Sequence, residues 1–190
     1  MADAPPASRP ATGTPRIPPG GIAEIGPVNA IIAHVAGRVT GTGPLNIFTT
    51  LGRHRSLFRP WLRFAGRLMP RGKLPRVDTE LLILRVAHNC GCEYEWRHHE
   101  RLAKRVGLSA AEVEKARDGA LAGHFRARQV LLLRAADQLH EDRMISDELW
   151  SELRRECSDV ELIELCMLVG HYEMLAMTLN SLGVSPEEAR

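Results

Sequence analysis

The chain has 190 residues, of which 44% are hydrophobic but only 5% aromatic, and its formal net charge at pH 7 is +2. This length and apolar content suit one domain with its own core, and the near balance of charge gives no reason to expect nucleic acid or a membrane as partner. Four cysteines are too few for a disulfide-based secreted scaffold, and no apolar run resembles a membrane span or a signal peptide, so we expect a soluble, cytoplasmic protein.

The N-terminal segment, residues 1–21, is rich in proline and alanine and has almost no large apolar side chain. Ordering such a segment costs more conformational entropy than its burial returns, so we expect a disordered arm. Residues 22–190 are then expected to form one folded domain. Short helices are expected over residues 28–35 and 45–51, with a glycine- and proline-containing loop between them.

Residues 55–69 predict a clearer helix, because their apolar side chains recur at helical spacing. Between Arg53 and Arg76 there are eight Lys or Arg residues and no acidic residue. This basic stretch could steer an anionic substrate. A nucleic-acid site is not expected there, since interleaved aromatic residues and a recognition motif are missing.

A helix that carries Glu80 is expected next, with Asp78 as its N-cap. The residues Asn89, Cys90 and Gly91 are expected to end this helix and to start the following one. The break matters because it separates two segments that both hold ionisable side chains.

The second of these segments places Cys92, Glu95 and His99 at offsets of three and seven. Positions with this spacing share one face of a helix, so a thiol, a carboxylate and an imidazole could converge with Glu80 on one small volume. Cys92 would lie in the first turn, where the helix dipole favours a thiolate. The surrounding apolar residues would bury these groups and perturb their pKa values.

Further helices are expected in the C-terminal half. Residues 109–112 and 158–161 both have the pattern of a capping box, a helix is expected over 124–140, and residues 146–147 cap another. The helix after residue 158 is expected to end near Gly183 and is apolar on most of its circumference, so it is either the central core element or shared with another subunit. No strand alternation is evident, and the predicted fold class is all-α.

In combination, these residues resemble the carboxymuconolactone decarboxylase and alkylhydroperoxidase D-like family. The resemblance rests on Glu80, Cys92, Glu95 and His99 at their spacings, and on Tyr-Glu-Trp at residues 94–96, which is similar to one branch of the family. Later matching positions are Asp137, His140, Asp147, Trp150, 168–174 and 180–184. The resemblance covers about residues 45–185. It implies a single-domain helical bundle and a homo-oligomer, commonly a dimer, trimer or hexamer.

One position departs from the peroxidase branch, in which two cysteines stand three residues apart at the positions of Cys92 and Glu95. Peroxide reduction through a disulfide needs a second thiol, which a glutamate cannot supply. Cys90 could replace it only from the break before the helix, because residues i and i+2 of a regular helix point about 200° apart.

Three functions therefore remain open. The first, favoured by the resemblance to the decarboxylase branch, is an enzyme whose Glu80, Glu95 and His99 move a proton next to a carbonyl of a small carboxylate or lactone substrate, with nearby arginines binding the carboxylate. The second is a thiol peroxidase that uses Cys92, with Cys90 or an external thiol as its partner. The third is a non-catalytic oligomeric scaffold.

Structural roles are the alternative for each of these side chains. Glu95 and His99 could form an ordinary i, i+4 ion pair, His98 is expected to be exposed, and His171 is expected to be structural on the polar stripe of the last helix. Cys92, Glu95 and His99 could also offer three zinc ligands, but the usual paired Cys or His spacings are missing. We therefore predict neither a metal nor another cofactor.

Overall fold

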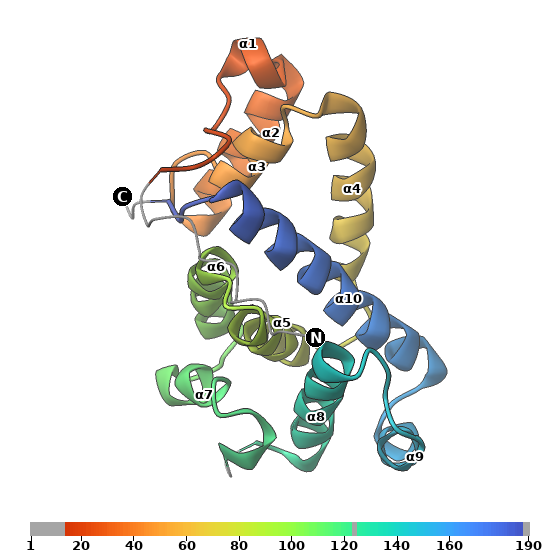
Figure 1. The fold of residues 1–190 in the computed structure, drawn as a ribbon. Helices are drawn as coiled ribbons and strands as arrows, with labels where there is room; N and C mark the ends of the chain where they lie inside the picture. Colours follow the sequence, from red (N-terminus) through yellow and green to blue (C-terminus); the bar gives the residue numbers. More distant parts are fainter. Residues whose placement is uncertain (1–13, 123–124, 188–190) are drawn as a thin grey trace, which may run out of the picture.

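The computed structural model describes residues 14–122 and 125–187, and helices are the regular structure in these ranges (Figure 1). The all-α prediction is confirmed. The helices are α1 (Ile22–Ile25), α2 (Pro27–Thr40), α3 (Asn46–Leu51), α4 (Arg55–Leu68), α5 (Arg76–Asn89), α6 (Glu93–Arg105), α7 (Ala110–Lys115), the 3-10 helix η1 (Gly119–Ala122), α8 (Ala127–Glu141), α9 (Asp147–Glu156) and α10 (Asp159–Leu182).

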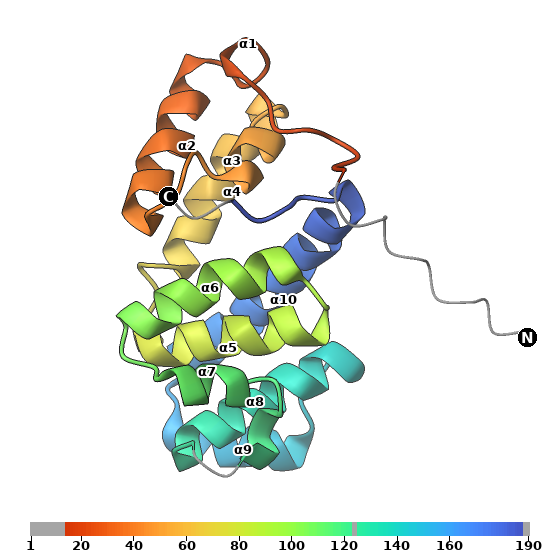
Figure 2. The same cartoon turned by 90° about the vertical axis from the view of Figure 1, so that its left-hand side faces the viewer.

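Two helices organise the core. α5 packs against α6, α8 and α10, and its apolar run from Leu81 to Leu84 is fully buried. α10 crosses the molecule and also contacts α4, α8 and α9 (Figure 1). Figure 2 shows α1 to α4 gathered at one end and α7 to α9 at the other, with α5, α6 and α10 between them. The residues predicted to carry chemistry thus lie in the middle of the fold.

α10 buries one side and exposes another. Leu162, Leu165 and Leu179 are buried, whereas Ile163 and Met177 are exposed. The sequence analysis expected no apolar run that resembles a membrane span. By its length and composition, however, α10 could cross a membrane, since an 18-residue window has a mean hydropathy of 1.4. Of that window, 56% is buried inside the fold, as in the core helix of a soluble protein.

The start of α5 differs from the prediction. α5 begins at Arg76 with Pro75 as its N-cap, and Asp78 is not the cap but a buried carboxylate inside the first turn. Arg128 and Gln129 on α8 donate hydrogen bonds to its two oxygens, at 3.0 Å and 3.3 Å. Asp78 therefore links α5 to α8. Its carboxylate accepts hydrogen bonds from α8 instead of from the backbone N–H groups at the start of α5.

The capping boxes at Ser109 and Ser158 are both present, and Ser146 caps α9 as predicted. In the N-terminal arm, residues 1–13 lie outside the described residues. The backbone N–H of Arg16 donates to the Leu182 carbonyl at 2.8 Å, and that of Gly20 donates to the Thr49 carbonyl at 3.0 Å. Residues 16–20 are thus held against the fold by backbone hydrogen bonds.

Candidate functional site

The break between α5 and α6 is a tight, hydrogen-bonded turn. Gly91 has a φ of 56°, a left-handed conformation that glycine adopts without penalty. The N–H of Gly91 donates to the His88 carbonyl at 2.9 Å, and that of Cys92 donates to the Ala87 carbonyl at 2.7 Å. This pair of bonds is the Schellman arrangement. As a result, Cys92 is the N-cap of α6, whereas the sequence predicted it one position further on, inside the first turn.

A cavity of about 450 Å³ lies next to this turn, within the range of roughly 300–1,000 Å³ usual for small-molecule sites. Two of the predicted residues, Glu95 and His99, line it, whereas Glu80 and Cys92 do not. Most of the wall is apolar. The lining side chains come mainly from α2 (Ala36, Val39, Thr40), α3 (Ile47, Phe48), α4 (Trp61, Leu62, Ala65), α6 (Tyr94, Glu95, His98, His99, Leu102) and α10 (His171, Tyr172, Leu175).

Glu80 and His99 form a buried pair between α5 and α6. The Nδ1 atom of His99 lies 2.7 Å from Glu80 Oε2, and the Glu80 side chain is fully buried. Arg76, one turn earlier on α5, donates from Nη2 to the other Glu80 oxygen. Since the carboxylate accepts from Nδ1–H, the unprotonated nitrogen of a neutral His99 is Nε2, and the ring lines the cavity.

Glu95 stands in a different environment, although it is only one turn away from His99. It is 2% exposed, and neither of its carboxyl oxygens has a hydrogen-bond partner among the described residues. Burial raises the pKa of Glu95 well above its usual range, and the neighbouring Cys92 thiol opposes this only in part. Burial therefore favours the neutral form of Glu95 on the cavity wall, one helical turn from an imidazole that is hydrogen-bonded to another carboxyl group.

The thiol of Cys92 does not have the predicted character. It is 1% exposed, and burial, followed by the adjacent Glu95, raises its pKa rather than lowering it. The prediction of a dipole-stabilised thiolate is wrong, because desolvation outweighs the helix N-terminus in this packed position. All four cysteines are free thiols.

Cys90 does lie in the break, as a disulfide with Cys92 would require. Its sulfur, however, donates to Glu173 Oε1 at 3.6 Å and lies 4.0 Å from His140 Nδ1. Burial and the Glu173 carboxylate raise the pKa of Cys90 to about 12. Both thiols are thus held in the protonated form.

Several polar groups of the cavity were not predicted. His98 and His171 line it, and the Nδ1 atom of each is buried without a hydrogen-bond partner among the described residues. The prediction that His98 is exposed is wrong, and His171, which was expected to be structural, lies on the cavity wall. Burial lowers the pKa of His98 to about 3 and that of His171 to about 4, so both rings are neutral at pH 7. Helical spacing did not identify His98, because it selects only the residues on the same face as Glu95 and His99. The cavity is wide enough to include the adjacent position as well.

Two further donors complete the wall. Trp61 Nε1 and Arg76 Nη1 are buried without a partner among the described residues, and both side chains line the cavity. The Trp61 ring is stacked on His171, with centroids 6.1 Å apart. A buried polar atom without a partner costs about 1–3 kcal/mol. Such atoms gathered from α4, α5, α6 and α10 around one cavity are the arrangement expected of a site that a polar ligand completes.

The sequence model of the carboxymuconolactone decarboxylase family matches residues 55–138. Over these residues, which are less than half of the chain, the sequence is similar to that family. The matched segment contains all four predicted site residues, and the similarity supports a decarboxylase- or peroxidase-related enzyme in general. No curated protein is significantly similar to the chain in sequence.

Solved structures share the fold of this chain at low sequence identity. An uncharacterized peroxidase-related protein from Silicibacter sp. TM1040 has a TM-score of 0.80 at 13% identity, covering 94% of this chain and 96% of that one. The alkylhydroperoxidase AhpD core protein from Ralstonia eutropha JMP134 has a TM-score of 0.78 at 16% identity, covering 92% and 94%. The debrominase Bmp8 in its apo form has a TM-score of 0.77 at 16% identity, covering 91% and 92%.

Proposed function

We propose that the protein is an acid/base enzyme that moves a proton next to a carbonyl of a small carboxylated or lactone substrate, as in decarboxylation of a β-keto acid or opening of a lactone. The observation that carries the proposal is the contrast between two carboxyl groups near the cavity, one hydrogen-bonded to His99 and the other one helical turn from it. Glu80 is paired with Arg76 and His99, whereas Glu95 is buried without a hydrogen-bond partner in the described part of the chain and its pKa is raised. Carboxyl groups in such different environments serve as base and acid.

The roles follow from this geometry. Glu80 fixes the Nδ1–H tautomer of His99, so Nε2 can accept a proton from the carbon next to the substrate carbonyl. Glu95, which is neutral, donates a proton to the oxygen or carbon on which negative charge develops. In a proton shift, His99 then delivers its proton to another carbon and the enol hydroxyl returns its proton to Glu95, so both groups are restored. In decarboxylation the C–C bond to the carboxylate breaks, CO2 leaves, and Glu95 protonates the enolate and is reprotonated from solvent. In lactone opening, water adds to the carbonyl, His99 takes the proton of the water, and Glu95 protonates the leaving ring oxygen. No oxidant is required.

Substrate binding in this proposal uses the partnerless groups of the cavity. Arg76 Nη1 is buried and has no hydrogen-bond partner within residues 14–122 and 125–187, whereas Nη2 donates to Glu80. Nη1 can therefore donate to a substrate carboxylate. Trp61 Nε1 offers a neutral donor on another helix, α4. The apolar remainder of the wall suits the hydrocarbon part of the substrate.

Turnover of a panel of lactones and β-keto acids tests this proposal. Glu95→Gln and His99→Ala should each lower kcat by about 10²-fold or more, the usual contribution of one acid or base. Glu93→Gln and His88→Ala are matched controls, since they make the same chemical changes at exposed positions on α6 and α5. Substrate turnover by both active-site variants at the wild-type rate would end the proposal.

Thiol peroxidase chemistry through Cys92 is the alternative function, and the position of Cys92 beside the cavity residue Glu95 is the observation in its favour. The raised pKa of Cys92 and the contacts of Cys90 with Glu173 and His140 weigh against it. Thiols counted before and after one equivalent of an organic hydroperoxide decide between the two. Rapid loss of the Cys92 thiol would favour the peroxidase.

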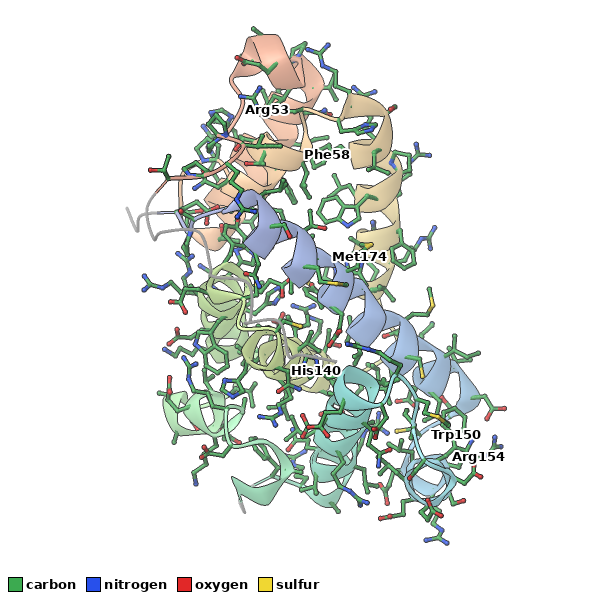
Figure 3. The ribbon with its side chains drawn as sticks, viewed as in Figure 1. Arg53, Phe58, His140, Trp150, Arg154 and Met174 are labelled. Atoms are coloured by element: carbon green, nitrogen blue, oxygen red, sulfur yellow. The ribbon has the colours of Figure 1, made fainter. Side chains whose placement is uncertain are left out.

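We also propose that copies of the chain associate through α10. Its outer face exposes Ile163, Met167, Met174 and Met177, with Met174 visible on that face in Figure 3. A contiguous apolar stripe of this kind usually marks a protein contact. Light scattering of the purified protein measures the mass directly, and a monomer at micromolar concentration would contradict the assembly.

A further inference from the structure

A second cluster of ionisable side chains lies outside the cavity, where the ends of α5 and α8 meet the middle of α10; His140 of this cluster is labelled in Figure 3. Cys90 is the C-cap of α5, His140 is in the last turn of α8, and Glu173 lies on α10. None of the three lines the cavity, and the proposed reaction uses none of them.

The donor atoms of this cluster converge. Cys90 Sγ lies 3.6 Å from Glu173 Oε1 and 4.0 Å from His140 Nδ1, and the last two atoms are 2.5 Å apart. A thiolate sulfur, an imidazole nitrogen and a carboxylate oxygen are the ligand types of Zn²⁺ and similar divalent ions. The three donor atoms lie within 4.8 Å of one another, close enough to hold one ion.

We propose that Cys90, His140 and Glu173 form a binding site for a divalent transition-metal ion of the zinc type. Tetrahedral zinc with its usual bond lengths separates neighbouring donor atoms by roughly 3.4–3.6 Å. The sulfur–oxygen distance of 3.6 Å already fits this spacing. Sulfur and nitrogen must approach by about 0.4 Å, which rotation of the Cys90 and His140 side chains would supply, and nitrogen and oxygen must separate by about 0.9 Å, which rotation of Glu173 would supply. The side chain of His140 is 30% exposed, so water can take the fourth position.

Neighbouring side chains hold two of the three ligand residues in position. Asn180 donates to the carbonyl of Cys90 at 3.0 Å and fixes the end of α5. Arg143 donates to Glu173 Oε2 at 2.8 Å, which leaves Oε1 for the ion. Such contacts behind the ligands orient them and strengthen metal binding. The Arg143 side chain is 69% exposed and can also move away when the ion brings its own charge.

Binding of the ion would change the chemistry of Cys90. The thiol proton leaves to solvent when sulfur coordinates, and the thiolate is then committed to the metal. Cys90 could not form a disulfide with Cys92 in that state. Metal binding would therefore prevent Cys90 from taking part in redox chemistry with Cys92.

Metal titration of the full-length, chelator-treated protein tests the proposal. Calorimetry with Zn²⁺ should show one ion bound per chain, and Co²⁺ should give the charge-transfer absorption of a cobalt–thiolate bond. Cys90→Ser should abolish that absorption and, like His140→Gln and Glu173→Gln, weaken zinc binding at least tenfold. Cys166→Ser is the matched control, since it removes another half-buried thiol and should leave both signals unchanged.

Two results would overturn the proposal. One is the absence of saturable binding of Zn²⁺ at micromolar concentration. The other is binding that survives Cys90→Ser but is lost in Cys92→Ser, which would place the ion at Cys92 instead. Far-ultraviolet circular dichroism checks that each variant is folded. If Cys90→Ser does not fold, the partly exposed His140 provides the decisive variant.

Discussion

Glu95 offers the sharpest test of the physical reasoning, because it is a buried carboxyl group without a hydrogen-bond partner among the described residues. The substitution Glu95→Gln keeps the shape of the neutral acid but cannot ionise. Burial raises the pKa of Glu95 in the folded protein, whereas the unfolded chain releases this proton above its ordinary pKa of about 4.3. Between these two pKa values, the folded state holds one proton more than the unfolded state.

The sign and size of the effect follow from proton linkage. When the folded state binds the extra proton, the free energy of unfolding falls as pH rises, by about 1.4 kcal/mol per pH unit for one group. The wild type should therefore lose stability relative to Glu95→Gln as pH rises above the unfolded pKa. The full penalty is present above the folded pKa, and it disappears below the unfolded pKa, where both states are protonated.

Urea unfolding followed by circular dichroism between about pH 5 and pH 7, at a fixed protein concentration, measures this difference. Glu93→Gln is the control, since Glu93 lies on the same helix but its side chain is 60% exposed. A free-energy difference between wild type and Glu95→Gln that stays constant over this pH range would refute the idea that burial keeps Glu95 neutral.

Three further outcomes are expected. Glu80→Gln should lower kcat at least tenfold without loss of helicity, because the amide no longer fixes the His99 tautomer; an unchanged kcat would remove Glu80 from the mechanism. Ile83→Ala should lower the free energy of unfolding by about 2–5 kcal/mol in urea, since Ile83 is fully buried, and a loss below about 1 kcal/mol would contradict its place in the core. Cys92 should resist alkylation by iodoacetamide at neutral pH until the protein unfolds, because burial raises its pKa; fast labelling of the folded protein would contradict this.

Local signals in the sequence predicted the helices well. The capping boxes at Ser109 and Ser158 and the N-cap at Ser146 are present, because a cap depends on side chains within three residues of the helix start. Asp78 shows where this reasoning fails. Aspartate is a common N-cap residue, but the Asp78 carboxylate accepts hydrogen bonds from two side chains of α8. The sequence pattern within α5 does not reveal these partners.

The site was predictable in part for the same reason. The i, i+4 spacing of Glu95 and His99 placed both on one face of α6, and the structure shows both on the cavity wall. Trp61 and His171 complete that wall from α4 and α10, which are far away in sequence. Their contribution depends on how these helices pack against α6, so helical periodicity alone could not identify them.

By itself, the sequence determined the helical class and brought a thiol, two carboxyl groups and an imidazole into one region, because helix spacing and capping act over a few residues. Only the tertiary structure decided the surroundings of these groups. Glu80 is held by Arg76 and His99, Glu95 is left without a partner among the described residues, and Cys92 is desolvated. The physical reason is that a pKa responds to burial and to neighbouring charges, and these are set by the packing of distant helices.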